Sequence, residues 1–209
     1  MNPDPRPLVV LDVQHAYRSS HPHDRGAVFT RANGLRVSEV DLVLGYVAAA
    51  ARQLAALGFQ VGTNNPATGL FVGPYQRRQA EASAMLACAY LACHVNAGGG
   101  RYGRVGLAHP RSSRLASSLA LGLARSAVAP RGYVCSTVGV KPHERGSVCI
   151  RFVECPAVLL EPFFGDNPEH LARFGTPGGL QALGEDIAVA VAEWYWSEQD
   201  RVDRGRPAV

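Results

Sequence analysis

Short apolar runs alternate with longer amphipathic segments along this chain, and no other feature limits its fold as strongly. Four runs are typical of buried strands, namely PLVVLDV (7–13), FQVGT (59–63), the run ending at Cys93, and AVLLEPF (157–163). Four segments have the residue spacing of amphipathic helices: 38–57, 75–87, 111–128 and 179–196. Strands separated by helices of this length predict βαβ units. We therefore expect an α/β fold, a single domain with a twisted, mainly parallel β-sheet flanked by helices on both faces.

The remaining segments are assigned by composition. SVCIRF (147–152) predicts a further strand, whereas the Gly- and Arg-rich segment 96–111 indicates a loop over one end of the sheet. The last residues, SEQDRVDRGRPAV, are charged. We expect the folded domain to span residues 1–196 and the charged C-terminal tail to span residues 197–209.

Composition excludes several classes of partner. The net charge of +4 suits an anionic surface such as a cell-wall polymer, but the chain has no Lys/Arg block of the kind that binds nucleic acid. No apolar run reaches the roughly 18 residues of a membrane span. The N-terminus, MNPDPRPLVVLDV, lacks the pattern of a secretory signal, so we expect synthesis in the cytoplasm without a signal peptide.

The cysteines indicate a reducing compartment. They are odd in number and scattered, at Cys88, Cys93, Cys135, Cys149 and Cys155. No CxxC pair occurs, which argues against a cysteine-rich zinc site. We expect reduced thiols that pack as small apolar side chains. The side chain of Cys93 should point to the opposite face of its strand from that of His94.

Residues with metal-binding or acid–base chemistry fall where the predicted strands end. His15 follows the first strand, His94 follows the third, and Glu161 closes AVLLE. Glu39 lies in the first turn of the helix predicted over 38–57. Ligands of an open parallel sheet bind beyond the carboxyl ends of its strands. Singly, each residue has a plainer explanation: a loop or core histidine, an acid favoured by the helix dipole, or an acid paired with an arginine.

The joint occurrence of these residues is more informative than any one of them. Two imidazoles and one carboxylate form a three-ligand zinc set with an open fourth position. A further glutamate that is not a ligand could serve such a site as its base. Neither HExxH nor HxxE occurs, which excludes the common helical zinc-protease motifs as the source.

Four blocks of the sequence resemble a known family in order and spacing. They are VVLDVQH, SEVDLVLGYVAAAARQLAALGFQV, YQRRQAEASAMLACAYLACHVNAGG and PAVLLEPFFGDN. Together they are similar to the N-acetylmuramoyl-L-alanine amidases of the amidase-3 type over about residues 7–196. The last block is the most specific single piece. DVQHAY departs from the family's usual first motif by lacking its proline and three glycines, which let the backbone turn tightly.

The resemblance implies both an activity and the roles of residues. It implies hydrolysis of the amide between N-acetylmuramic acid and L-alanine in peptidoglycan, with Zn²⁺ held by His15, Glu39 and His94. Glu161 would be the catalytic base. Two residues next to the ligands would orient the imidazoles, Asp12 and Asn96.

Other interpretations stay open at this point. The chain could be an inactive amidase-like module that binds peptidoglycan or serves as a phage structural component, although Glu161 argues against it because binding needs no base. It could also be a zinc peptidase that cuts the stem peptide. Because no signal pattern is visible, the protein resembles a bacteriolytic endolysin that acts on the cell wall after release at lysis. An exported autolysin is the alternative.

Overall fold

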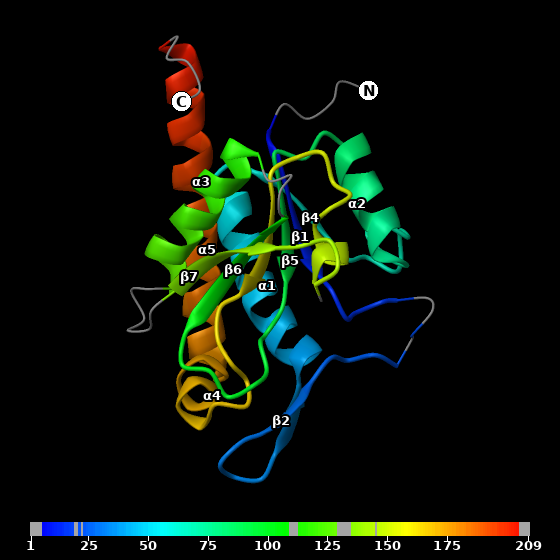
Figure 1. The fold of residues 1–209 in the computed structure, drawn as a ribbon, viewed down its shortest axis with the longest axis vertical. Coiled ribbons are helices and arrows are strands. Elements are labelled where there is room, and N and C mark those ends of the chain that lie inside the picture. Colours follow the sequence, from blue (N-terminus) through cyan, green and yellow to red (C-terminus); the bar gives the residue numbers. More distant parts are fainter. Residues whose placement is uncertain are drawn as a thin grey trace.

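One six-stranded sheet organises the computed structural model, which describes residues 6–18, 21, 23–108, 113–128, 135–144 and 146–204 (Figure 1). The strands in spatial order are β4 (Gln60–Thr63), β1 (Leu8–Val13), β5 (Ala89–Cys93), β8 (Ala157–Glu161), β6 (Gly103–Ala108) and β7 (Cys135–Val140). β4, β1, β5 and β8 run parallel, β6 is antiparallel to β8, and β7 is parallel to β6. The prediction of a mainly parallel sheet is confirmed, with the four expected strands as successive neighbours.

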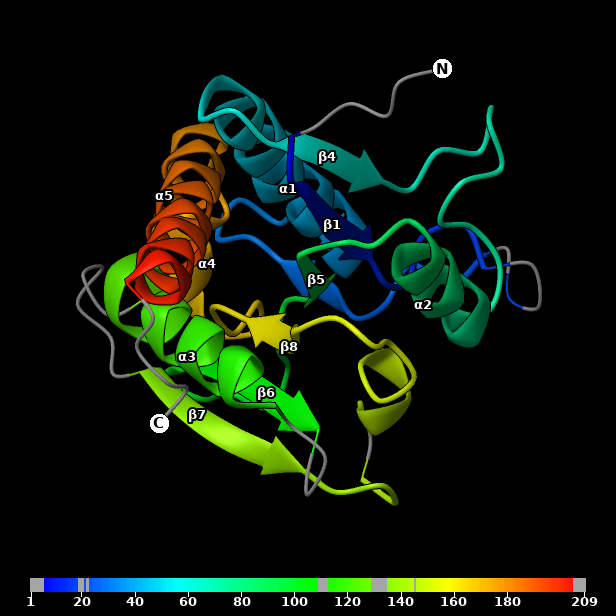
Figure 2. The same cartoon turned by 90° about the horizontal axis from the view of Figure 1, so that it is seen from above.

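Helices cover both faces of this sheet, as predicted, but unequally (Figure 2). One face carries α1 (Glu39–Ala56), α3 (Arg114–Gly122), which continues as a π-helix (Leu123–Val128), α4 (Pro168–Phe174) and α5 (Pro177–Asp203). The other face carries α2 (Tyr75–Ala84) and a 3₁₀ turn (Ser147–Cys149). A two-stranded hairpin, β2 (Val28–Thr30) and β3 (Arg36–Ser38), precedes α1. Among the described helices, none combines the length and the apolarity needed to cross a membrane.

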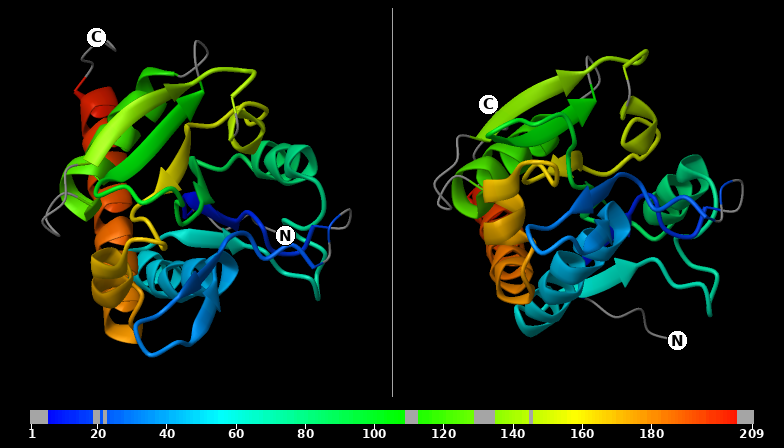
Figure 3. Two further views of the ribbon diagram at one scale, coloured as in Figure 1. Left: turned by 60° about the horizontal axis from the view of Figure 1, so that its bottom comes forward. Right: turned by 90° about the horizontal axis from the view of Figure 1, so that it is seen from below.

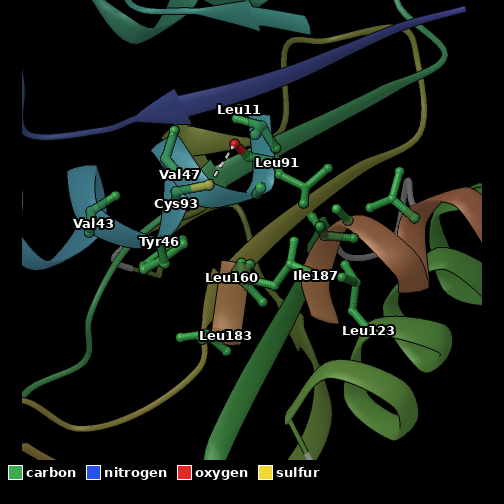
Figure 4. Packing of buried hydrophobic residues seen from close by; sticks show 14 of the residues in the cluster. Leu11, Val43, Tyr46, Val47, Leu91, Cys93, Leu123, Leu160, Leu183 and Ile187 are labelled. Atoms are coloured by element: carbon green, nitrogen blue, oxygen red, sulfur yellow. Dashed lines mark hydrogen bonds between the residues drawn. The ribbon is translucent and has the colours of Figure 1, made fainter. Parts of the chain in front are cut away.

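The larger apolar core lies between the sheet and the pair α1 and α5 (Figure 4). Alternate residues of the central strands point into it, because successive side chains of a strand face opposite ways. Cys93 is one of them and packs in this core, as predicted. The cysteines whose side chains are described are all free thiols: Cys88, Cys93, Cys149 and Cys155. The side chain of Cys135 lies outside the described part.

Residues 147–152 do not form the predicted strand. Gly146, at φ 97°, turns the chain, and the 3₁₀ turn follows directly. Gln79 of α2, which is fully buried, forms the hydrogen bonds to this backbone that a neighbouring strand would otherwise form. Its side chain donates to the carbonyl of Val148 at 2.8 Å and accepts from the N–H of Phe152 at 2.8 Å. This side-chain pairing replaces a ladder of strand hydrogen bonds.

The segment 96–111 is not all loop, because it contains β6. Gly106 of β6 lies so close to β7 and β8 that an added β-carbon would come within 2.9 Å of Val140 and 3.1 Å of Leu159. Gly106, one of the glycines that suggested a loop, therefore permits close strand contact. Neither β7 nor the β2–β3 hairpin was predicted. At the other end, α5 continues to Asp203, so residues 197–203 of the predicted tail are helical; the domain boundary itself stays a prediction.

A buried ion pair joins β1 to α2. Asp12 and Arg78 are both fully buried, and Nη1 of Arg78 lies 2.8 Å from Oδ1 of Asp12. Three further groups donate to the same carboxylate, from Asn64, Gln14 and Tyr90. Such a pair is tolerated inside a protein only when its remaining hydrogen-bonding groups are satisfied.

Replacing Arg78 with methionine is expected to destabilise the fold by about 3–5 kcal/mol, because Asp12 would be left as an unpaired buried charge. The adjacent Arg77 provides the control. It is largely exposed and pairs with Glu81 one turn along α2, so Arg77→Met is expected to change stability by less than about 1 kcal/mol. Denaturant unfolding of both variants measures the difference, and equal losses would contradict the importance assigned to the buried pair.

Candidate metal centre

Three side chains of metal-binding type meet at the carboxyl edge of the sheet. His15 lies on the turn after β1, Glu39 is the first residue of α1, and His94 directly follows β5. One ligand atom from each lies within 4.8 Å of the other two. In the described part of the chain, this is the one group of three or more such residues close enough to hold a metal ion. Figure 3 shows the blue segment that precedes α1 lying across this edge.

Glu39 is buried at the centre of the group. Its position is set by the start of α1, where Ser38 and Asp41 form a capping box. The carboxylate accepts from the backbone N–H groups of Ala27, at 3.1 Å, and Val95, at 3.1 Å. Burial alone would raise the pKa of Glu39, but the hydrogen bond and charge of His94, with smaller contributions from His15 and Ala27, lower it below the ordinary value.

His94 is held by the neighbouring strand β8 and by α1. Its N–H donates to the carbonyl of Leu160 at 2.9 Å, and its own carbonyl accepts from the hydroxyl of Tyr46 at 3.0 Å. Its Nδ1 lies 2.9 Å from Oε1 of Glu39. Burial would lower the pKa of His94, but the nearby Cys149 thiol and the Glu39 carboxylate raise it above the ordinary value. A metal ion entering here would displace the proton that this pair shares.

His15 sits on a turn that has no glycine and is held by Arg78 instead. The Arg78 guanidinium donates to the carbonyls of Val13, Gln14 and Ala16, the residues around His15. The turn ends at Tyr17, whose φ of 56° is uncommon for a side chain of this size. The hydrogen bonds from a buried arginine therefore hold a backbone path that glycines would otherwise ease.

The described hydrogen bonds of the two residues predicted to orient the imidazoles do not reach an imidazole. The described hydrogen bonds of Asp12 go to Arg78 and its polar neighbours, so Asp12 acts on His15 only through the Arg78-bound turn. The reason is that the Asp12 side chain points to the α2 face of the sheet. Asn96 donates to Oε2 of Glu161 at 3.3 Å, which places it beside the predicted base.

Asp24 contacts the candidate site, and sequence reasoning missed it. Its Oδ2 lies 3.0 Å from Nδ1 of His15, and its Oδ1 accepts from the N–H of Gly26 at 2.9 Å. Gly26 has φ 68°, and an added β-carbon there would collide with the Glu39 carboxylate. The Asp-x-Gly sequence that begins nine residues after His15 was the one available signal.

The surroundings of Asp24 favour the ionised form of its carboxyl group. Burial alone would raise its pKa, but hydrogen bonds from His15, Gly26 and Arg18 outweigh it and lower the pKa to about 2. Asp24 therefore carries a full negative charge at neutral pH.

Glu161 lies beside His94 at the ends of two paired strands. Cys93 pairs with Leu160, so the next residues, His94 and Glu161, are neighbours on the same face of the sheet. Arg104 of β6 pairs with Glu161 from the other side, with its Nε 3.8 Å from Oε2. Glu161 is not one of the three clustered ligand-type residues. It is thus placed next to a metal position and held by polar contacts.

The three clustered residues fit a divalent metal ion of zinc type. Two imidazole nitrogens and one carboxylate oxygen are a common zinc donor set that leaves a position open. Each imidazole faces a different oxygen of Glu39: Nε2 of His15 lies 3.6 Å from Oε2, and Nδ1 of His94 faces Oε1. One donor atom from each residue thus lies within 4.8 Å of the other two.

Comparison with known proteins places this geometry in a recognisable fold. No protein-family model and no curated protein matches the sequence. Among solved structures, the chain is similar to the N-acetylmuramoyl-L-alanine amidase AmiC2 of Nostoc punctiforme, with 21% identity, a TM-score of 0.69, and 91% of this chain and 97% of that chain covered. It is similar to the amidase Ami1 of Mycobacterium smegmatis, with 18% identity, a TM-score of 0.71, and coverage of 91% and 97%.

The catalytic domain of CD27L, an endolysin targeting Clostridia difficile, is a third similar structure. It has 16% identity, a TM-score of 0.58, and coverage of 90% of this chain and 98% of that chain. These identities are low, while the shared architecture extends over nearly the whole chain. The chain has the fold of the N-acetylmuramoyl-L-alanine amidase catalytic domains.

Proposed function

We propose that this chain is a zinc-dependent N-acetylmuramoyl-L-alanine amidase. Its substrate would be the peptidoglycan amide that joins the lactyl group of N-acetylmuramic acid to L-alanine. The clustering of His15, Glu39 and His94 within 4.8 Å, with Glu161 next to His94 on the neighbouring strand, carries the proposal. The amidase fold supports it, because the solved structures that share this fold include enzymes named for that reaction.

The site residues have two kinds of role, binding the metal ion and transferring a proton. His15, Glu39 and His94 hold the ion; zinc, when bound, supplies a Lewis acid that acidifies water and polarises a carbonyl. Glu161 takes a proton from the attacking water and delivers it to the alanine nitrogen as the C–N bond breaks. The products are a lactyl carboxylic acid and a peptide with a free alanine amino group. Asn96 and Arg104 keep the Glu161 carboxylate in place, since both contact its Oε2.

An endolysin role is the cellular setting we favour, with release onto the cell wall at lysis. The likeness to the CD27L endolysin domain supports it. An autolysin with the same chemistry would differ only in how it reaches the wall.

Protein purified without added metal is expected to contain close to one zinc ion per chain by elemental analysis. His94→Ala should lose most of it, because a site with three protein ligands cannot spare one. The exposed His143 lies outside the cluster, so His143→Ala should keep the zinc of the native protein. Full zinc retention by His94→Ala would remove His94 from the ligand set.

Glu161→Ala is expected to keep the fold and the zinc but to lower the hydrolytic rate by about two to four orders of magnitude, the span typical of a lost general base. Mass spectrometry of digested peptidoglycan provides the assay. The native protein should generate new L-alanine amino termini and leave the glycan strands intact.

Each other result identifies a different function. Cleavage inside the stem peptide would support a zinc peptidase, and binding without any cleavage would support a non-catalytic module. Loss of zinc in Glu161→Ala would make Glu161 a ligand, and unchanged activity would contradict its role as the base.

A further inference from the structure

A neutral imidazole can offer a lone pair to a metal from only one of its nitrogens, because the other nitrogen carries the proton. In His15, Nε2 points toward Glu39, with 3.6 Å between Nε2 and Oε2. Nδ1 points the opposite way, toward Oδ2 of Asp24 at 3.0 Å. The ring is therefore a metal ligand through Nε2 only if its proton stays on Nδ1.

Asp24 is built to hold that proton in place. Its Oδ1 accepts from the N–H of Gly26 at 2.9 Å, and its Oδ2 accepts from Nη1 of Arg18 at 2.7 Å. Arg18 is fixed in turn, because its guanidinium lies 4.7 Å from the centre of the Tyr75 ring. The carboxylate is thus anchored on both oxygens and presents a fixed acceptor to His15.

We propose that Asp24 is a positioning residue that keeps the proton of neutral His15 on Nδ1 and so leaves the Nε2 lone pair for the metal ion. This inference rests on the metal centre of the proposed function. Ligating histidines commonly donate their second ring nitrogen to a carboxylate, and loss of such a partner typically weakens metal binding about 10- to 100-fold. Arg78 holds the backbone of the His15 turn, whereas Asp24 fixes which nitrogen of the His15 ring carries the proton.

The surroundings of Asp24 make it suitable for substitution. Its side chain is 23% exposed and lines a cavity of about 590 Å³ together with Arg18, Tyr17 and His23. Removing the carboxylate there leaves no void in the apolar core. Asp24→Ala is therefore expected to fold, and circular dichroism and denaturant unfolding verify it.

The first measurement is zinc affinity by competition with a chelator, on the full chain. Asp24→Ala is expected to bind zinc about 10- to 100-fold more weakly. Asp24→Asn should recover part of the loss, because an amide oxygen can still accept from Nδ1. Glu198→Ala is the matched control: it removes a buried carboxylate that pairs with Arg114 near the far end of α5, so it should cost stability and leave zinc affinity unchanged.

The second measurement is the tautomer of His15 in metal-free protein, by nitrogen NMR of labelled histidine at a pH about two units above the ordinary histidine pKa of about 6.5. The native ring should be protonated on Nδ1, and Asp24→Ala should shift the proton toward Nε2. Native zinc affinity in Asp24→Ala would overturn the proposal. Weaker affinity with the proton still on Nδ1 would also overturn it, since Asp24 would then act in some other way.

The two proposals fail in different experiments. If the native protein binds zinc and Asp24→Ala binds it weakly with a shifted tautomer, the inference holds even when peptidoglycan is not cleaved. If the native protein cleaves peptidoglycan and Asp24→Ala keeps native zinc affinity, the amidase proposal holds and the role of Asp24 does not.

Discussion

The buried pair of Asp12 and Arg78 is the interaction on which the candidate site depends most. It places a full positive charge between β1 and α2, where neither side chain reaches solvent. An ion pair in such a place is stable only if nearly every donor is used. Arg78 uses its donors on Asp12, on Gly73 and on the carbonyls of the His15 turn. The need to satisfy one buried charge thus defines the backbone that presents His15, the first of the proposed metal ligands.

The segment between β1 and α1 completes the site from the opposite side. Asp24 orients His15, and Gly26 allows the chain to pass directly against Glu39. The capping box at Ser38 then fixes where α1 begins and so where Glu39 points. Backbone N–H groups and histidine hold the Glu39 and Asp24 carboxylates, and Asn96 and Arg104 contact the Glu161 carboxylate. A metal centre and its neighbouring base both benefit from such preorganisation.

The sequence predicted the features that depend on local patterning. Buried parallel strands require continuous apolar runs, and amphipathic helices require a repeating apolar face, so β1, β5, β8, α1 and α5 were all predicted. Because the carboxyl ends of parallel strands share one edge, the positions of His15 and His94 after two such strands also predicted that they would meet.

Only the tertiary structure decided the features that depend on partners distant in the chain. Residues 147–152 have a strand-like composition but turn, because Gln79 bonds their backbone, whereas the glycine-containing β6 becomes a strand because β8 and β7 lie on either side of it. Arg77 and Arg78 are identical in type and adjacent, yet one is exposed and the other holds the His15 turn. The sequence alone determined which segments bury apolar surface and where they end, since that is a property of local composition. The pairing of each polar group depends on which other groups the folded chain brings within hydrogen-bonding distance, and local patterns do not encode it.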